Sequence, residues 1–253
     1  MKNSQIAVQL WTLRNFLKTP ADVVETFRKV RKIGYEAIEL AGLPPMDEAE
    51  IVRIADGEGL TICAIHADGA SIVNEPEKMI DHLNKLNCKY VGYPWPHVIP
   101  HTMPEAIAAA KVLNDAAEKY AAAGIGMCYH NHAVEYQKID GKIMQDLFFD
   151  YAPALLAEID TYWVQVGGCE PLEWVKKMSG RLPLLHVKDY MVRKDFSTGM
   201  TWVGGGNLNW DGIIDAAEKG GTKYFIVEED DCIDICPFES ITNSYNFLKG
   251  FVK

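Results

Sequence analysis

Short apolar runs alternate with amphipathic stretches along the whole chain, and this alternation restricts the fold more than any other feature. Eight runs have the length and composition of buried strands: IAVQLW (6–11), AIEL (37–40), TICAIH (61–66), KYVGY (89–93), IGMCYHNH (125–132), LLAEID (155–160), LPLLHV (182–187) and KYFIVEE (223–229). Helices are predicted between them, with Pro or Asp near several starts and Gly after several ends, at 20–33, 46–58, 75–86, 103–123, 170–178, 209–219 and 238–251. The alternation predicts an α/β protein with a single (β/α)8 TIM barrel, with residues 1–253 forming one domain.

Composition limits the partners of such a barrel. The 253 residues are 48% hydrophobic, which is enough for one large core. The formal net charge is −10, and Lys and Arg are scattered among acidic residues without forming a basic stripe. Nucleic acid is therefore not an expected partner. The sequence has no run of eighteen apolar residues and no signal-peptide pattern after Met1, so we expect a cytoplasmic protein that does not bind membranes.

The cysteines suggest neither a disulfide framework nor a zinc site. They do not form a CxxC pair, and several lie in or beside apolar runs. We expect reduced, mostly buried thiols at Cys63, Cys88, Cys128, Cys169, Cys232 and Cys236. The CIDIC segment at 232–236 is the exception to watch, because it closely follows Glu228.

Four segments at or just beyond predicted strand ends carry side chains that bind metals: Glu135 in YHNHAVEY, Asp160 in AEID, His186 in LLHVKD and Glu228 in IVEED. A parallel barrel brings the carboxyl ends of its strands to one face, so these groups are expected to converge on one divalent cation. Each has a simpler alternative role. Asp160 could cap a helix or form a salt bridge, His186 could be structural, and Glu228 begins an acidic run in which Glu229 is the competing candidate.

Two further histidines accompany this set. His130 and His132 are two positions apart on a predicted strand, so their side chains point to the same face. They are candidates for moving protons in the site, unless that face of the strand is turned outward.

Other strand ends provide aromatic and polar side chains that suit a sugar, whose ring presents apolar C–H patches and hydroxyl groups. The candidate substrate-binding residues are Gln9, Trp11, Glu39, His66, Trp95, Trp163 and Lys188. Core packing is the alternative role of the aromatic residues, and Lys188 could simply pair with an acid. A longer stretch, 189–208, lacks clear periodicity and is predicted to be a functional loop. The chain has no P-loop, GxSxG or dinucleotide fingerprint, so phosphate-bearing cofactors are not supported.

Several segments in order resemble the xylose isomerase-like TIM barrels of the sugar phosphate isomerase/epimerase superfamily: AVQLWTLR, YHNHAVEY, IDTYWV, GRLPLLHVKDY, GNLNW and VEEDDCIDICPFES. The resemblance implies a divalent ion, most often Mn²⁺ with Zn²⁺, Mg²⁺ or Co²⁺ as alternatives, bound by Glu135, Asp160, His186 and Glu228. Several relatives have the first glutamate where this chain has His130, so His130 is the alternative to Glu135 as first ligand. Gly204–Gly206 stand where many relatives have an acidic residue. Dimers are common among similar barrels, and a homodimer is left open.

The chemistry of such a site follows from its charges. A cation bound to a sugar carbonyl acidifies the neighbouring C–H and stabilises an enediolate. We predict a metal-dependent sugar isomerase or epimerase in which Glu135 and Glu228 exchange the proton and His130 or His132 serves the oxygens. A lyase or hydrolase acting on an inosose or a 3-keto glycoside is the alternative reaction, and a non-catalytic sugar-binding barrel is the alternative class. The acidic charge argues against a related endonuclease.

Overall fold

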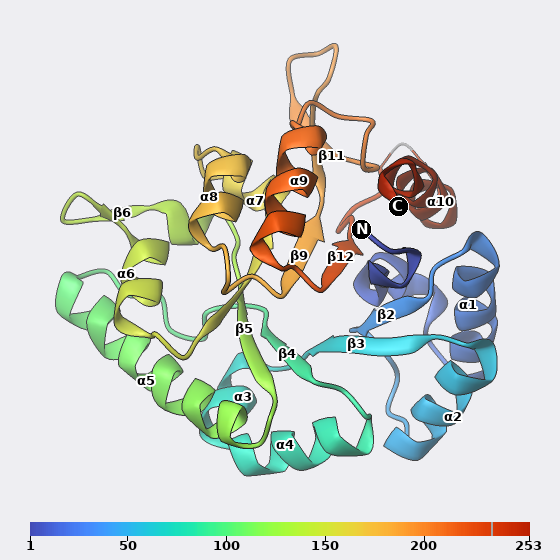
Figure 1. Ribbon diagram of the computed structural model, residues 1–253, viewed down its shortest axis with the longest axis horizontal. Coiled ribbons are helices and arrows are strands. Elements are labelled where there is room, and N and C mark those ends of the chain that lie inside the picture. The colour runs from blue at the N-terminus through green and yellow to red at the C-terminus, as the bar shows by residue number, and fades with distance from the viewer. Residues whose placement is uncertain (234) are drawn as a thin grey trace.

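Eight parallel strands close into one barrel, as the sequence predicts (Figure 1). The computed structural model describes residues 1–233 and 235–253, so Asp234 of the CIDIC segment lies outside the described residues. The barrel strands are β1 (Ile6–Gln9), β2 (Ala37–Leu40), β3 (Thr61–His66), β4 (Tyr90–Tyr93), β5 (Gly126–His130), β8 (Leu156–Asp160), β9 (Leu184–Val187) and β12 (Tyr224–Val227). They follow in sequence order around the barrel, and β1 pairs with β12 to close it.

Helices surround the barrel (Figure 1). They are α1 (Pro20–Ile33), α2 (Glu48–Glu58), α3 (Gly69–Asn74), α4 (Pro76–Lys85), α5 (Met103–Ala122), α6 (Met144–Tyr151), α7 (Thr161–Val166), α8 (Pro171–Lys177), α9 (Trp210–Gly220) and α10 (Pro237–Leu248). The sequence prediction lacked α3, α6 and α7, because six to eight residues are too few for a clear helical period. It also extended the first and fifth strands too far. Gln9 ends β1, since its side chain accepts a hydrogen bond from the Trp11 N–H and begins a 3-10 helix, Leu10–Phe16.

The inside of the barrel consists of an apolar floor and a polar upper part. Alternate residues of a strand face the same side, so a strand contributes to both parts. The floor is small and apolar and includes Ala7, Ala37, Ala64, Cys128, Leu184 and Ile226. Two residues further along these strands come Gln9, Glu39, His66, His130, His186 and Glu228. Strand periodicity alone therefore directs these six polar residues to the upper end of the interior.

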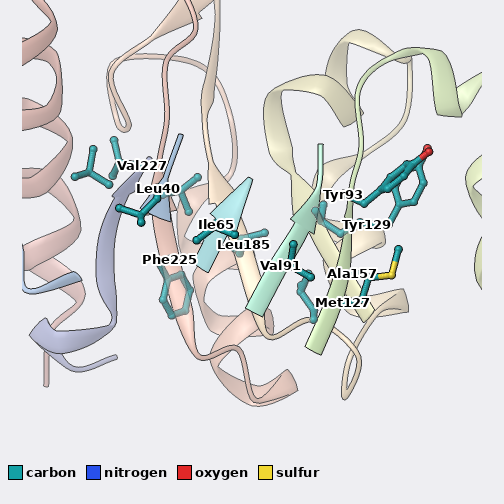
Figure 2. Packing of buried hydrophobic residues seen from close by; sticks show 14 of the residues in the cluster. Leu40, Ile65, Val91, Tyr93, Met127, Tyr129, Ala157, Leu185, Phe225 and Val227 are labelled. Atoms are coloured by element: carbon teal, nitrogen blue, oxygen red, sulfur yellow. The ribbon is translucent and has the colours of Figure 1, made fainter. Parts of the chain in front are cut away.

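The outward positions of the same strands pack against the helices. Figure 2 shows this layer, which includes Leu40, Ile65, Val91, Leu185 and Phe225. These side chains are almost completely buried. Removing a side chain of this size from water contributes about 1.5–3 kcal/mol. Burial on the outer side of the strands stabilises the barrel, so its inner side can hold charged residues.

The two ends of the chain meet where the barrel closes. Tyr35, just before β2, donates a buried hydrogen bond of 2.7 Å to the carbonyl of Ile241 in α10. The hydroxyl of Tyr245, also in α10, donates to Oδ1 of Asn3 at 2.8 Å. These contacts join the last helix to the first strands, across the β1–β12 seam.

All six cysteines are free, as expected, and Cys63, Cys88 and Cys128 are buried. Among the described residues, no helix combines the length and the apolar character needed to cross a membrane.

Replacing Tyr35 with Phe should lower the free energy of unfolding by about 1–2 kcal/mol, because the buried carbonyl of Ile241 would lose the hydrogen bond from the Tyr35 hydroxyl. Chemical denaturation measures the change, and Tyr151→Phe, at an exposed tyrosine, serves as control. Equal stability of Tyr35→Phe and wild type would show that this hydrogen bond does not secure the seam.

Candidate metal centre

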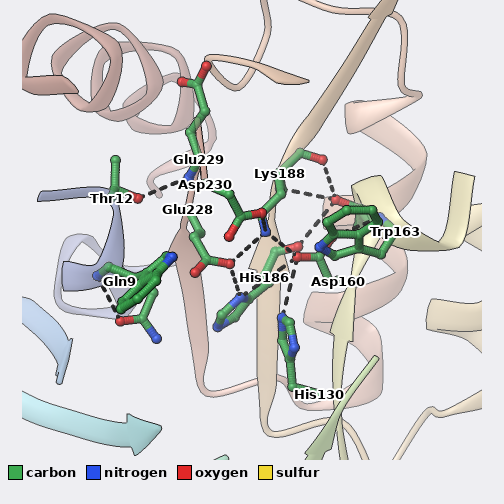
Figure 3. A network of polar contacts seen from close by, with 12 residues as sticks. Gln9, Thr12, His130, Asp160, Trp163, His186, Lys188, Glu228, Glu229 and Asp230 are labelled. Carbon is green, nitrogen blue, oxygen red and sulfur yellow. Dashed lines mark hydrogen bonds and ion pairs between the residues drawn. The ribbon is translucent and has the colours of Figure 1, made fainter. Parts of the chain in front are cut away.

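Four side chains from neighbouring strands converge at the upper end of the barrel (Figure 3). His130 ends β5, Asp160 ends β8, His186 lies in β9 and Glu228 follows β12. Each offers one nitrogen or oxygen, and these four atoms lie within 4.8 Å of one another. We call these residues the outer group. The register explains the convergence, because Asp160 pairs directly with His186, and His186 with Ile226, two residues before Glu228.

Lys188 joins the outer group from the same face of the chain as His186. Its ammonium lies 2.9 Å from Oδ2 of Asp160, 2.7 Å from Oε2 of Glu228 and 2.8 Å from Oδ2 of Asp230. The Lys188 side chain is fully buried. Three carboxylates thus surround one ammonium, which is more negative charge than Lys188 alone balances, and the imidazole of His186 also contacts Glu228, at 3.1 Å.

A second cluster, the inner group, lies deeper in the barrel and shares His186 with the outer group. It consists of Glu39, His66, Glu158 and His186. Nε2 of His66 lies 2.8 Å from Oε2 of Glu158 and 3.4 Å from Oε1 of Glu39. Nε2 of His186 lies 2.7 Å from Oε2 of Glu39 and 3.3 Å from Oε1 of Glu158. Each imidazole therefore contacts both carboxylates.

Burial and charge act against each other on the pKa values of these residues. Burial lowers the pKa of His186, but the carboxylates of Glu158, Glu39 and Glu228 more than reverse this and hold it well above the usual range. Burial raises the pKa of Asp160 and Glu228, but the ammonium of Lys188 overcomes this and keeps both below their ordinary values. Both carboxylates are therefore ionised and able to bind a cation.

His132 behaves differently from His186. Burial and the neighbouring His130 lower the pKa of His132 to about 3. Its ring makes an edge contact with Trp95 and a tilted one with Trp163. His132 is thus a neutral imidazole at neutral pH, able to offer either a donor or an acceptor to a ligand.

Glu135, which the sequence analysis favours over His130 as first ligand, lies outside both groups. Its carboxylate is buried and accepts hydrogen bonds from the Tyr129 hydroxyl at 3.1 Å and the His132 N–H at 2.7 Å. Glu229, the competitor of Glu228, points the other way and binds Ser240 of α10. His130 therefore occupies the position in the group that was predicted for Glu135.

A cavity of about 460 Å³ lies over the outer group. His130, His132, Glu228 and Asp230 line it on one side, and Trp11, His66, Asp68 and Trp95 line other parts. Trp11 and Trp95 remain 42% and 52% exposed, so each keeps part of its indole free for a ligand. Three of the predicted substrate-binding residues, Trp11, His66 and Trp95, therefore border the cavity.

The other four predicted substrate-binding residues are not among those that line the cavity. Gln9 and Glu39 are fully buried, and Lys188 is held by its three ion pairs. Trp163 packs near Lys188, with the ammonium 5.8 Å from its ring centroid. These positions suit residues that support the wall.

The sequence analysis missed Glu158 and Asp230. Strand alternation could have identified Glu158, which is two residues before Asp160 and shares its face. Asp230 is two residues after Glu228, but it follows the end of β12, where alternation no longer applies.

The stretch 189–208, predicted to be an irregular loop, is partly regular. It contains an antiparallel hairpin of β10 (Asp189–Val192) and β11 (Thr198–Thr201), which projects at the top of Figure 1. The carboxylate of Asp189 accepts hydrogen bonds from the N–H groups of Gly204, Gly206 and Leu208 and from the indole of Trp210. A Cβ at Gly206 would lie 2.4 Å from the carbonyl of Tyr190, so a side chain does not fit there.

Replacing Asp189 with Asn should destabilise the protein by at least about 2 kcal/mol, because several buried N–H groups would lose a charged acceptor. Denaturation measures the loss, and Asp195→Asn on the exposed hairpin turn is the control. An unchanged stability would mean that the segment 204–210 does not depend on Asp189.

The residues present fit a divalent cation. Two imidazoles and two carboxylates form a donor set used for Mn²⁺, Zn²⁺ and related ions. Nε2 of His130 and Oδ2 of Asp160 are buried and lie 3.4 Å apart, facing one position, and neither makes a standard hydrogen bond within the described chain, although Lys188 pairs with the latter. A cation would satisfy these atoms.

The closed parallel barrel makes this a TIM-barrel protein. The candidate site lies at the carboxyl ends of the strands, where TIM barrels hold their active sites. The xylose isomerase-like TIM barrel family model matches residues 27–240, and the chain belongs to this family. This confirms the family resemblance noted from the sequence.

Solved structures support the same fold. Two sugar phosphate isomerase/epimerases from Parabacteroides distasonis ATCC 8503 superpose with TM-scores of 0.84. One is 22% identical and covers 100% of this chain and 96% of its own, and the other is 25% identical with 98% and 99% coverage. A xylose isomerase-like TIM barrel protein from Mycobacterium smegmatis, in complex with magnesium, has a TM-score of 0.74 and 14% identity, covering 98% of this chain and 97% of its own. The comparison with curated proteins finds no match.

Proposed function

We propose that this protein is a divalent-metal-dependent sugar isomerase or epimerase that removes and returns a proton next to a carbonyl. The main support is the outer group, four buried ligand-type side chains of which His130 and Glu228 border a cavity. The names of the Parabacteroides proteins and the magnesium complex from the mycobacterial protein agree with this function.

His130, Asp160, His186 and Glu228 would hold the ion. Once His186 binds the ion as a neutral imidazole, one divalent cation would match the excess of carboxylates over the ammonium of Lys188. We choose His130 over Glu135, because the carboxylate of Glu135 already has two hydrogen-bond partners and does not belong to the group. Manganese remains the first metal to test.

A bound divalent ion would polarise a substrate carbonyl and so acidify the adjacent C–H. Glu228 is our candidate base, because it is ionised, borders the cavity and is held in place by Lys188. His132, which also lines the cavity, is neutral and can hydrogen-bond a substrate oxygen without adding charge. Glu135 accepts a hydrogen bond from the backbone of His132, and its role would be to fix that segment.

The cavity favours an uncharged sugar over a sugar phosphate. Its lining contains no Lys or Arg among the described residues, whereas Asp68, Glu228 and Asp230 are all acidic. The guanidinium of Arg14 stacks 5.0 Å from the Trp11 ring centroid and pairs with Asp231. The exposed parts of the Trp11 and Trp95 indoles suit the C–H faces of a sugar ring.

Elemental analysis of the purified protein should find about one divalent ion per chain, lost in Asp160→Ala. His130→Ala should also lose most of the ion, whereas Glu135→Gln should retain it. The reverse result, with metal lost only in Glu135→Gln, would restore Glu135 as ligand. A wild type that binds none of Mn²⁺, Zn²⁺, Mg²⁺ or Co²⁺ would refute the proposed mechanism.

Incubation with ketoses in D2O should introduce deuterium next to the carbonyl, which mass spectrometry detects. Glu228→Gln should slow this exchange by about 10²–10⁴-fold, the usual contribution of a positioned acid/base group. Glu229→Gln, a buried acid that faces α10, is the matched control and should exchange at the wild-type rate. Loss of water from a substrate during exchange would indicate the lyase reaction. Sugar binding without exchange, with every metal, would indicate a binding protein.

A further inference from the structure

The inner group contains two fully buried carboxylates that the proposed reaction does not use. Glu39 and Glu158 are each completely buried, and neither borders the cavity. Two such charges are costly inside a protein unless each is paired. Their only cationic neighbours in the described chain are the imidazoles of His66 and His186.

His186 is the link between the two groups, because each of its ring nitrogens faces a different one. Nδ1 lies 3.1 Å from Oε2 of Glu228 and 3.9 Å from Oδ2 of Asp160, in the outer group. Nε2 lies 2.7 Å from Oε2 of Glu39, in the inner group. When Glu39 is ionised its carboxylate only accepts hydrogen bonds, so in that state Nε2 carries the proton of this contact.

We propose that Glu39 and Glu158 are positioning residues that hold His186 by its Nε2–H, so that Nδ1 keeps a free lone pair for the cation. This rests on the proposed function, since it assumes a cation in the outer group. A carboxylate behind a metal-binding histidine fixes the orientation of the ring and raises its basicity. Glu39 thus acts from behind the site and does not touch the substrate, in contrast to the role predicted from the sequence.

The distances favour hydrogen bonding over a second cation in the inner group. The shortest N–O contacts, 2.7 Å for His186–Glu39 and 2.8 Å for His66–Glu158, are those of charge-assisted hydrogen bonds. Ligands of one tetrahedral ion at bonds of about 2.0–2.2 Å would lie roughly 3.4 Å apart. Each carboxylate of this group is already paired with an imidazole at hydrogen-bond distance, so the group does not require an ion.

Gly92 on β4 makes this arrangement possible. A Cβ at this position would lie 2.4 Å from Cδ2 of His66 and 2.5 Å from Oε2 of Glu158. Any side chain at position 92 would push apart His66 and Glu158, which pair on the side of the inner group away from His186 Nδ1. Gly92→Ala therefore disturbs the group without changing its charge.

The first test is the Mn²⁺ affinity of wild type, Glu39→Gln and Glu158→Gln, measured by titration calorimetry. Each variant should bind one ion about 10–100-fold more weakly, the range for residues that orient a metal ligand. Glu229→Gln, a buried acid outside both groups, is the matched control and should bind like wild type. Unchanged affinity in both inner-group variants would refute the inference and leave the proposed metal site intact.

A second pair of variants covers the case in which the Glu variants do not fold. Gly92→Ala should weaken Mn²⁺ binding at least about 10-fold. Gly126→Ala, whose Cβ would instead meet Tyr90 and Leu156 at the floor, should not. Equal affinity of these two alanine variants would count against the inference.

Two further readouts separate positioning from a merely structural role. In ¹⁵N-histidine-labelled protein loaded with Zn²⁺, NMR should show His186 protonated on Nε2, and a deprotonated Nε2 would overturn the inference. Wild type should bind one ion per chain. Two ions, one of them lost in Glu39→Gln, would show that the inner group is itself a metal site. No ion at all would refute the proposed function, and the inference with it.

Discussion

The central constraint in this structure is the burial of charge inside the barrel. Glu39, Glu158, Asp160 and Glu228 are all almost completely buried, at positions where many barrels hold apolar side chains. Removing a carboxylate from water costs several kcal/mol unless a partner is within reach. The arrangement of the upper barrel is therefore governed by pairing: each acid has a histidine or Lys188 within hydrogen-bond distance.

The stability that offsets this cost comes from elsewhere in the fold. The outward strand faces pack against the helices, and the floor beneath the polar residues is filled by alanine, cysteine and aliphatic side chains. Small floor residues let the strands approach closely, which keeps the side chains above them within contact distance across the barrel. Gly92 is a further small residue on an inward position, and its lack of a side chain leaves room for His66 and Glu158.

Strand alternation predicted the barrel and three of the four outer-group residues, because strand position alone directs Asp160, His186 and Glu228 inward. At the fifth strand alternation directs His130 inward as well, but it did not decide between His130 and Glu135 as the first ligand. There the sequence offers His130, His132 and Glu135 within six residues, and the choice depends on where the strand ends and the chain bends. β5 stops at His130, so Glu135 folds back onto Tyr129 and His132. Glu39 was identified as an inward polar residue, but its distance from the cavity depends on packing between strands far apart in sequence.

The two groups differ in a way that assigns them different tasks. In the inner group two imidazoles face two carboxylates at hydrogen-bond distances, so each carboxylate is paired without an added ion and the group can serve as a rigid base. In the outer group three carboxylates face one ammonium, and His130 adds a neutral imidazole, because burial and the nearby His186 lower its pKa. His130 and Glu228 of the outer group open on the cavity, whereas His66 alone of the inner group borders it. His186 belongs to both groups. The inner group therefore holds in place one of the side chains with which the outer group would bind the cation.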